Sequence, residues 1–241
     1  MKIIQRGLGL LIAFLGIFIW LVASFDLAVY GDNTYAFYER SYEKYQVLDD
    51  LQMEMPDVMY VTSEMMDYLK GKREDLSVVT TVDGTQRDFF DEQDRYHMKD
   101  VQDLFLQAFR LQRHALVLLV LCLVLFYRIG KSACTSKAQL KILCQSYWIG
   151  IVLFFSALGG LVYLFYTDFT KYFIIFHEIF FDNDLWIFDP EVNLMIRMLP
   201  ESFFYDISAR IVFVFAIGLV AFFLASLLGY RYLISKTNAK D

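Results

Sequence analysis

The sequence predicts a mainly α membrane protein, in which four transmembrane helices carry an extracytoplasmic domain of amphipathic helices and a small β-hairpin. Composition is the first reason: 57% of the 241 residues are hydrophobic and only 21% are charged, which is too apolar for an ordinary soluble domain. Hydropathy patterning is the second, because four apolar stretches approach or exceed the roughly 20 residues that a helix needs to cross the hydrocarbon core. We expect the chain to form one membrane-embedded domain over residues 1–241.

The four predicted spans cover residues 3–25, 110–127, 147–166 and 211–234. The second is short as an apolar run, but the pattern of residues 101–109 is helical and predicts one continuous helix through both segments. The first resembles a signal peptide, yet its apolar region exceeds the usual length of about 7 to 15 residues. We therefore expect an uncleaved signal anchor.

The charged residues predict the topology. Lys and Arg gather before the first span, between the second and third spans and after the fourth, whereas residues 26–109 and 167–210 are acidic. Because basic segments stay on the cytoplasmic side, we expect a multi-pass protein with both termini in the cytoplasm and the two acidic segments outside. The net charge of -6 and the acidic outer face argue against nucleic acid as a partner.

The first outer segment contains signals for two helices and a hairpin. Tyrosines recur every three or four residues over 35–48, which indicates an amphipathic helix with a tyrosine packing face. Pro56 separates this helix from a second helical piece over residues 57–69. Residues 76–82 are rich in β-branched side chains and run into Asp83-Gly84, a dipeptide that favours a two-residue hairpin turn.

The second outer segment is rich in aromatic residues. Their spacing over residues 172–181 predicts a short amphipathic helix near the membrane surface. Asp189-Pro190 has the pattern of a helix start, with an N-cap acid before a proline at the first helical position. A further start at Pro200-Glu201 leads into the fourth span.

Two of the three histidines lie in these outer segments. His97, expected in the first turn of the helix that becomes the second span, and His177 are each flanked by aromatic and acidic residues. Histidine is the side chain best suited to exchanging a proton near neutral pH. Each could equally be a hydrogen-bonded structural histidine, and a paired site is the hypothesis that we carry forward. His114 is expected to be an interfacial residue.

Metal-binding motifs near His177 are incomplete. A zincin motif needs a second histidine four residues after the first, and Phe181 stands at that place. Asp182-Asn-Asp184 resembles the opening of a calcium loop, but Ile187 and Asn193 occupy the positions of its glycine and glutamate. We therefore expect no metal and no cofactor.

A protein nucleophile is not expected either. The sequence contains no G-x-S-x-G elbow and no phosphate-cradling glycine loop. Cys122 falls within the second span, and Cys134 and Cys144 fall on the inner loop. None of the cysteines is therefore placed to attack an outer substrate or to form an outer disulfide.

Several short motifs of the outer segments together resemble one known family. They are His97-Met-Lys-Asp-Val101, His177-Glu-Ile-Phe-Phe181, Asn183-Asp184, Trp186, Pro190, Leu194-Met-Ile196 and Pro200-Glu-Ser-Phe-Phe204. With the four spans, they resemble the bacterial four-span integral membrane family that includes the lipoprotein intramolecular transacylase. The resemblance implies an enzyme of the bacterial cell membrane that moves an acyl chain from the sn-2 glycerol ester of a diacylated lipoprotein to the α-amine of its N-terminal cysteine. The product is a lyso-form lipoprotein.

The candidate residues suit this reaction. The attacking amine and the ester belong to one molecule, so proximity supplies much of the acceleration. His177 as base and His97 as acid, or the reverse, would share the proton transfers. The second outer segment also offers four candidates for binding substrate or stabilising the oxyanion, namely Asn183, Asp184, Trp186 and Arg197. The implied partners are the diacylated lipoprotein and membrane lipid, and the oligomeric state is left open.

Two other functions fit the sequence. A membrane hydrolase acting on a lipid or lipoprotein ester would use water as the acceptor and release free fatty acid. A non-enzymatic accessory or sensor protein would use its acidic outer domain to bind a partner and its basic inner loop to contact anionic lipid. A transporter is least compatible with the sequence, because the spans contain hardly any internal charge.

Overall fold

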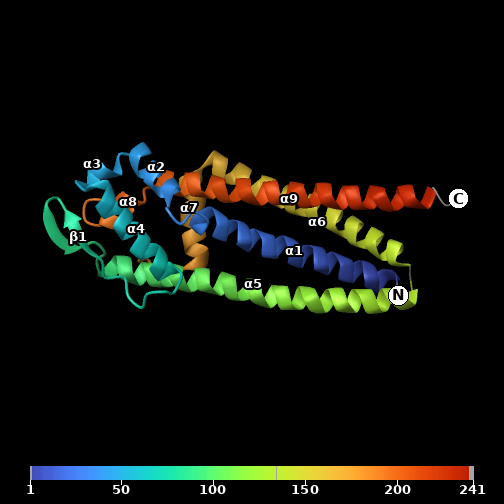
Figure 1. Ribbon diagram of the computed structural model, residues 1–241. Coiled ribbons are helices and arrows are strands. Elements are labelled where there is room, and N and C mark those ends of the chain that lie inside the picture. The colour runs from blue at the N-terminus through green and yellow to red at the C-terminus, as the bar shows by residue number, and fades with distance from the viewer. Residues whose placement is uncertain (1, 134, 239–241) are drawn as a thin grey trace. The chain divides into compact units, whose positions relative to one another are not determined.

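The computed structural model describes residues 2–133 and 135–238, and it confirms the predicted fold class (Figure 1). Four helices are long and apolar enough to cross a membrane, and each contains one of the predicted spans. They are α1 (Lys2–Tyr30), α5 (Glu92–Ala133), α6 (Ser136–Thr167) and α9 (Glu201–Asn238).

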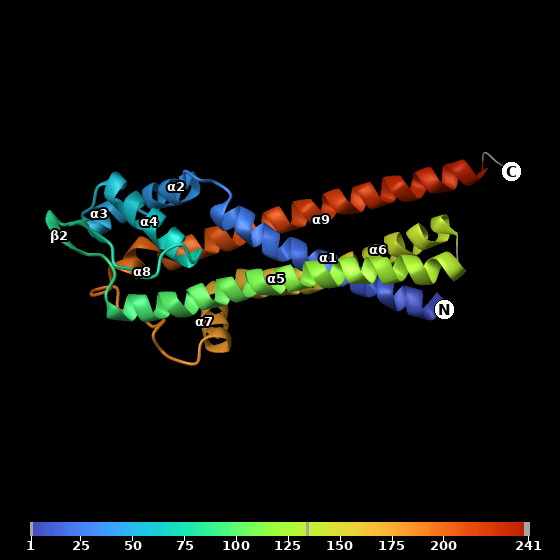
Figure 2. The same cartoon turned by 60° about the horizontal axis from the view of Figure 1, so that its bottom comes forward.

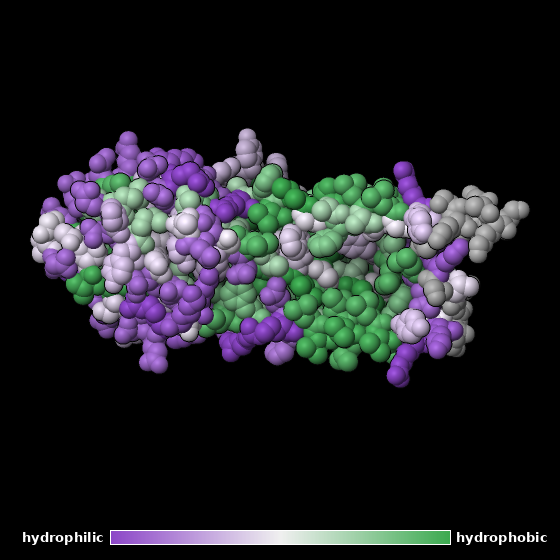
Figure 3. Space-filling model, viewed as in Figure 1, coloured by the Kyte–Doolittle hydropathy of each residue, from purple (hydrophilic) through white to green (hydrophobic). Residues whose placement is uncertain are grey.

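The chain divides into two compact units. The span unit comprises Met1–Phe25, Arg110–Tyr163 and Val212–Asp241, and the head unit comprises Asp26–Phe109 and Leu164–Ile211. These boundaries lie close to those between the predicted spans and the predicted outer segments. On the face shown in Figure 3, the surface of the span unit is mostly hydrophobic along the helices, whereas that of the head unit is mostly hydrophilic.

The span unit has a small buried core of apolar and aromatic side chains. Ile17 of α1 meets Phe215 and Leu219 of α9, and the indole N–H of Trp20 donates to the carbonyl oxygen of Phe215 at 3.0 Å. The hydroxyl of Tyr147 on α6 donates to the carbonyl oxygen of Leu219 at 3.1 Å. Such contacts give the polar atoms of aromatic side chains a partner where water is excluded.

Three short helices of the head unit, α2 (Ala36–Lys44), α3 (Val47–Leu51) and α4 (Met55–Leu69), lie together beside the hairpin (Figure 2). Helix α3 contacts α2, and α4 contacts α2 and the first hairpin strand. The predicted continuous helix over residues 35–48 is wrong, because the chain breaks at Gln46, whose φ of 55° is left-handed. After the break, Val47 and Leu51 of α3 are both buried.

The predicted β-hairpin is confirmed. Strands β1 (Val79–Val82) and β2 (Thr85–Asp88) are antiparallel, with Val82 paired to Thr85. Asp83 and Gly84 between them both have positive φ, at 48° and 67°. This is the backbone that a type I′ turn requires and that the Asp-Gly dipeptide favours.

The second part of the head unit begins with α7 (Phe169–Phe180), capped by the carboxylate of Asp168, which accepts from the backbone N–H of Lys171 at 3.0 Å. The predicted helix start at Asp189-Pro190 is wrong. Asp189 accepts from the N–H of Glu191 at 2.9 Å, but the chain forms only a turn there. The short helix α8 (Leu194–Met198) starts later, with its apolar side buried.

We expect Gly218→Ala to destabilise the span unit. Gly218 of α9 lies against Trp20 of α1, and a Cβ atom at this position would overlap the indole ring. Forcing an extra carbon into a packed core costs roughly 1–3 kcal/mol, which a lower midpoint of thermal unfolding in detergent would report. Gly229→Ala on the same helix is the matched control, because nothing lies within 4 Å of its added Cβ. An equal loss in both variants would contradict this packing.

Candidate active site

The first histidine of the site, His97, is positioned by the beginning of α5. This helix begins at Glu92, so His97 lies in its second turn. The prediction that His97 lies in the first turn is therefore wrong. Asp91 and Asp94 cap the helix reciprocally: the N–H of Asp94 donates to Asp91 Oδ1 at 2.8 Å, and the N–H of Asp91 donates to Asp94 Oδ2 at 3.0 Å. This exchange is the capping-box arrangement, with aspartate in both places.

The second histidine, His177, is on the last turn of α7. Its Nδ1 lies 2.7 Å from the carbonyl oxygen of Phe173. Because a carbonyl oxygen only accepts, Nδ1 carries the hydrogen and donates. The neutral ring therefore has its lone pair on Nε2, which is the form of histidine that can take a proton at that atom.

The structure brings these two rings together within the head unit. The ring centroids of His97 and His177 are 6.0 Å apart, and the ring planes are inclined by 30°. Both side chains are buried, with 7% and 8% of their surface exposed. Aromatic rings enclose the pair, with centroid distances of 4.4 to 5.5 Å to the nearer histidine; they belong to Phe173, Phe176, Phe181, Trp186 and Phe188.

Burial keeps both histidines neutral at pH 7. Helix α5 has 42 residues and is about 63 Å long, roughly twice the thickness of the hydrocarbon core. Its first 18 residues, which include His97, belong to the head unit and precede the spanning part. Desolvation and the nearby His177 lower the pKa of His97 to about 4, although Asp100 opposes the shift. Desolvation also lowers the pKa of His177, against the hydrogen bond to Phe173.

The loop between α7 and α8 is hydrogen-bonded to the first turns of α5. The Gln93 side-chain amide donates to the carbonyl oxygens of Leu185 at 3.0 Å and Ile187 at 2.9 Å. At the end of the loop, the Asn193 amide donates to Asp91 Oδ2 at 2.6 Å. These bonds place Trp186 and Phe188 against the histidines.

The four predicted substrate or oxyanion residues are placed differently. Trp186 lies beside His177, with ring centroids 4.9 Å apart. The Asn183 amide donates to Asp100 Oδ2 at 2.9 Å, and Asp184 is exposed on the same loop. Arg197 instead pairs with Asp50 of α3, its Nε 2.9 Å from Oδ2.

Sequence reasoning missed three residues of this site. Phe188 was one aromatic residue among many, and Gln93 binds backbone carbonyls about 90 positions away, so neither carried a local signal. Asp94 did carry one, because aspartates three residues apart before a helical pattern indicate a capping box. The signal did not stand out because Asp94 lies in a run of acidic residues.

The remaining candidate features lie elsewhere. His114 is exposed in the span unit. Cys122 and Cys144 are buried and free, and Cys134 lies outside the described residues. Within residues 2–133 and 135–238, no group of three or more His, Cys, Asp or Glu side chains is placed to hold a metal ion.

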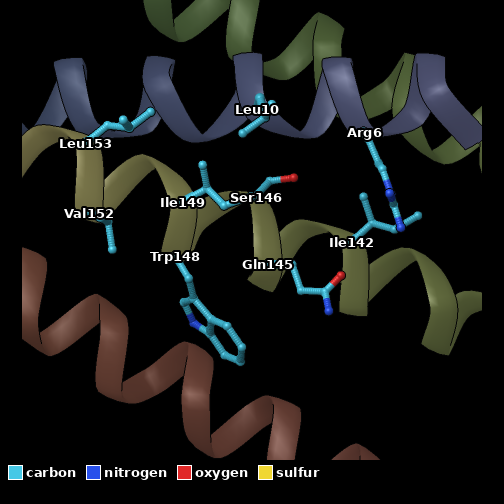
Figure 4. Close-up of a pocket in the computed structure, with 9 residues that line it drawn as sticks. All are labelled: Arg6, Leu10, Ile142, Gln145, Ser146, Trp148, Ile149, Val152 and Leu153. Carbon is cyan, nitrogen blue, oxygen red and sulfur yellow. The ribbon is translucent and has the colours of Figure 1, made fainter.

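A cavity of about 630 Å³ occurs in the span unit, lined by residues of α1 and α6. Figure 4 shows Arg6 and Leu10 on α1 facing the cavity, with Ile149 and Val152 on the α6 side. Its walls are mostly aliphatic and include no histidine. The cavity therefore offers mainly apolar surface, and its polar side chains are those of Arg6, Gln145 and Ser146.

A helical membrane fold with two buried, neutral histidines defines an integral membrane protein whose site is suited to moving protons between reacting groups. The family model of the lipoprotein intramolecular transacylase, Lit, matches residues 10–204. The chain therefore belongs to the lipoprotein intramolecular transacylase family and is a multi-pass membrane acyltransferase.

Solved structures share the fold. The membrane integral lipoprotein intramolecular transacylase Lit from Bacillus cereus has a TM-score of 0.72 at 21% identity, with 99% of this chain and 100% of that chain covered. A variant with a histidine replaced by arginine gives 0.69 at 20% identity, covering 100% and 96%. A variant with a histidine replaced by alanine gives 0.70 at 20% identity, covering 99% and 97%. No curated protein matches the chain.

We expect His97 to gain its proton only near pH 4, because its buried ring favours the neutral form. Histidine-selective NMR of labelled protein between pH 7.5 and the acid limit of folding should show that the titration of the His97 ring begins far below pH 6. The spectrum of His97→Gln identifies that signal by its disappearance. A His97 signal that titrates near the ordinary value of about 6.5 would contradict the buried, aromatic setting described above.

Proposed function

We propose that the protein transfers an acyl chain from the sn-2 glycerol ester of a diacylated lipoprotein to the α-amine of its N-terminal cysteine, leaving a lyso-form lipoprotein. The observation that carries this proposal is the pair of buried, neutral histidines 6.0 Å apart in a member of this family. The amine and ester belong to one substrate, so the enzyme has to orient them and move one proton from nitrogen to oxygen.

His177 is the base in this proposal. Its Nδ1–H is held by the carbonyl oxygen of Phe173, which directs the Nε2 lone pair toward the other side of the ring. As the amine attacks the ester carbonyl, Nε2 takes the proton that the nitrogen loses. The lowered pKa of His177 keeps the ring unprotonated and ready at neutral pH.

His97 is the acid. When the tetrahedral intermediate collapses, the C–O bond to glycerol breaks and the departing oxygen takes the ring N–H proton of His97. The proton that His177 took from the amine then passes to His97, so both rings are again neutral and the net transfer is from nitrogen to oxygen. The indole N–H of Trp186, next to His177, is the donor that we assign to the oxyanion. Asn183 and the exposed Asp184 contact the substrate from the loop in this proposal, whereas the ion pair with Asp50 favours a structural role for Arg197.

The proposed location of this reaction is the outer face of a bacterial cell membrane. Basic residues flank the spans on the side of both termini, whereas the head unit is acidic. By the positive-inside rule, the termini lie in the cytoplasm and the histidines lie outside, where the lipid-modified N-terminus of an exported lipoprotein is accessible.

Replacing either His97 or His177 by Ala should abolish conversion of the diacylated lipoprotein while the protein stays in the membrane. Each histidine is assigned a separate proton transfer, and a general acid or base contributes about 10²- to 10⁴-fold. Mass spectrometry of lipoprotein N-termini from cells with equal amounts of each variant would measure the N-acylated, singly O-acylated cysteine.

His114→Ala and a variant without the three cysteines are the controls, and both should keep activity. Activity retained after either site substitution would refute the role of that histidine. Loss of activity without cysteines would indicate an acyl-cysteine intermediate. Free fatty acid in place of the N-acylated product would identify a hydrolase.

The topology has its own test in single-cysteine variants of the cysteine-free chain. A cysteine introduced at Thr85, which is exposed in the hairpin, should react with a membrane-impermeant maleimide added to intact cells. Native Cys134, kept as the single cysteine, should react only after the cells are opened. The opposite labelling pattern would place the histidines on the cytoplasmic side and exclude the proposed substrate.

A further inference from the structure

The basic residues of the span unit have almost no acidic partners within that unit. Its three segments contain eleven Lys and Arg residues, and Asp241, the last residue of the chain, is their one acidic residue. Along α1, the acid nearest to Arg6 is Asp26, 20 positions further on, which is about 30 Å in a helix. A cation at the edge of the hydrocarbon needs an anionic or polar partner, so these residues need counter-ions from outside the protein.

Arg6 is the cation that lines the cavity between α1 and α6. Figure 4 shows its side chain beside Ile142 at one end of the cavity, with Leu153 at the opposite end. Arg6 is exposed, and among the described residues its guanidinium group forms no ion pair and no hydrogen bond. By the positive-inside rule this end of α1 faces the cytoplasm, where the phosphate groups of the inner leaflet lie.

The remainder of the cavity has the dimensions of an acyl chain in one leaflet. From Ile142 to Leu153 it follows 11 residues of α6, about 17 Å, which is close to half of the roughly 30 Å hydrocarbon core. Its volume of about 630 Å³ is within the range of roughly 300–1,000 Å³ for small-molecule sites. Ile149, Val152 and Leu153 line the cavity and are 52%, 63% and 53% exposed, so it is a groove open to lipid.

Two polar side chains of the groove need a partner. Gln145 and Ser146 lie one helical turn beyond Ile142, and neither side chain forms a hydrogen bond within the part of the chain that the structure describes. The indole N–H of Trp148, in contrast, donates to Ser226 Oγ at 2.8 Å. A polar group that faces hydrocarbon without a partner is costly, and the ester oxygens of a glycerolipid lie just below its phosphate.

We propose that this groove binds an anionic phospholipid of the cytoplasmic leaflet. The phosphate pairs with the Arg6 guanidinium group, whose planar fork matches two phosphate oxygens. The ester oxygens accept from Gln145 and Ser146, and one acyl chain lies against the aliphatic part of the groove. A zwitterionic lipid brings its own ammonium group, so the unbalanced positive charge of the span unit favours a headgroup with net negative charge. This site is separate from the two histidines and does not depend on the proposed reaction.

Trp148 lines the groove and can report on its occupant. Lipids brominated on the acyl chain quench tryptophan fluorescence on contact. The full chain is reconstituted in phosphatidylcholine vesicles that contain the same small fraction of either brominated phosphatidylglycerol or brominated phosphatidylcholine. The quenching that disappears in Trp148→Phe is the signal of the groove. We expect this signal to show about a fivefold preference for phosphatidylglycerol, as for one cation beside an anionic headgroup.

Three substitutions test the parts of the site. Arg6→Gln should bring the preference close to one, and Arg6→Lys should leave an intermediate preference because it keeps the charge without the fork. Val152→Phe leaves every charge in place and narrows the groove, so it should reduce quenching by phosphatidylglycerol. Arg128→Gln is the matched control and should keep the wild-type preference, because Arg128 is an exposed cation of the same unit that does not line the groove.

Four results would overturn the inference. They are equal quenching of wild-type Trp148 by the two lipids, an undiminished preference in Arg6→Gln, undiminished quenching in Val152→Phe, and a loss in Arg128→Gln as large as that in Arg6→Gln. The last result would mean that the general surface charge attracts the lipid. Arg6 and Val152 are both exposed, so their variants should fold, and equal midpoints of thermal unfolding in detergent would verify it.

Discussion

The exclusion of water from the two histidines is the constraint on which the rest of the site depends. Protonating a buried imidazole costs free energy, so such a ring exchanges protons through its neutral tautomers. The hydrogen-bond partner of Nδ1 selects the tautomer and so decides whether Nε2 donates or accepts a proton. At His177 that partner is a carbonyl oxygen of its own helix. At His97, Nδ1 meets no hydrogen-bond partner among the described residues. The two imidazoles are chemically identical, but their Nδ1 atoms have different surroundings.

Keeping water out requires segments far apart in the chain to meet, and the first turns of α5 are where they do so. Asp91, Gln93 and Asp100 each bind the loop that follows α7. Elsewhere in the head unit, Asp206 near the start of α9 accepts from the Tyr45 hydroxyl at 2.7 Å, and Asp50 pairs with Arg197. The acidic residues that make the head unit negative are therefore partly structural, because several of them form hydrogen bonds and ion pairs that hold loops and helix ends in place.

The sequence was sufficient for features with a local cause. Long apolar runs predicted the spans, Asp83-Gly84 predicted the hairpin turn, and the rarity of histidine made His97 and His177 conspicuous. The break at Gln46 and the late start of α8 were missed because tertiary contacts decide them. At α8, Asp189 caps only a turn by accepting from the N–H of Glu191, and Asn193 just before the helix is bound to Asp91, 102 positions away. The aromatic enclosure was equally invisible, because in a chain with 24 phenylalanines no pattern distinguishes Phe188 from the others.

The absence of a nucleophile motif in the sequence is consistent with the proposed chemistry. A covalent acyl-enzyme is useful when the acyl acceptor arrives separately, because the enzyme then stores the acyl group between two binding events. In an intramolecular transfer the acceptor is bound together with the donor. An acyl-enzyme intermediate would then only expose the acyl group to hydrolysis. What the reaction needs is a dry site that holds amine and ester in contact while one proton crosses from nitrogen to oxygen. In the proposed mechanism two neutral histidines enclosed by aromatic rings meet that need, and their low exposure would also keep water from competing as the acceptor.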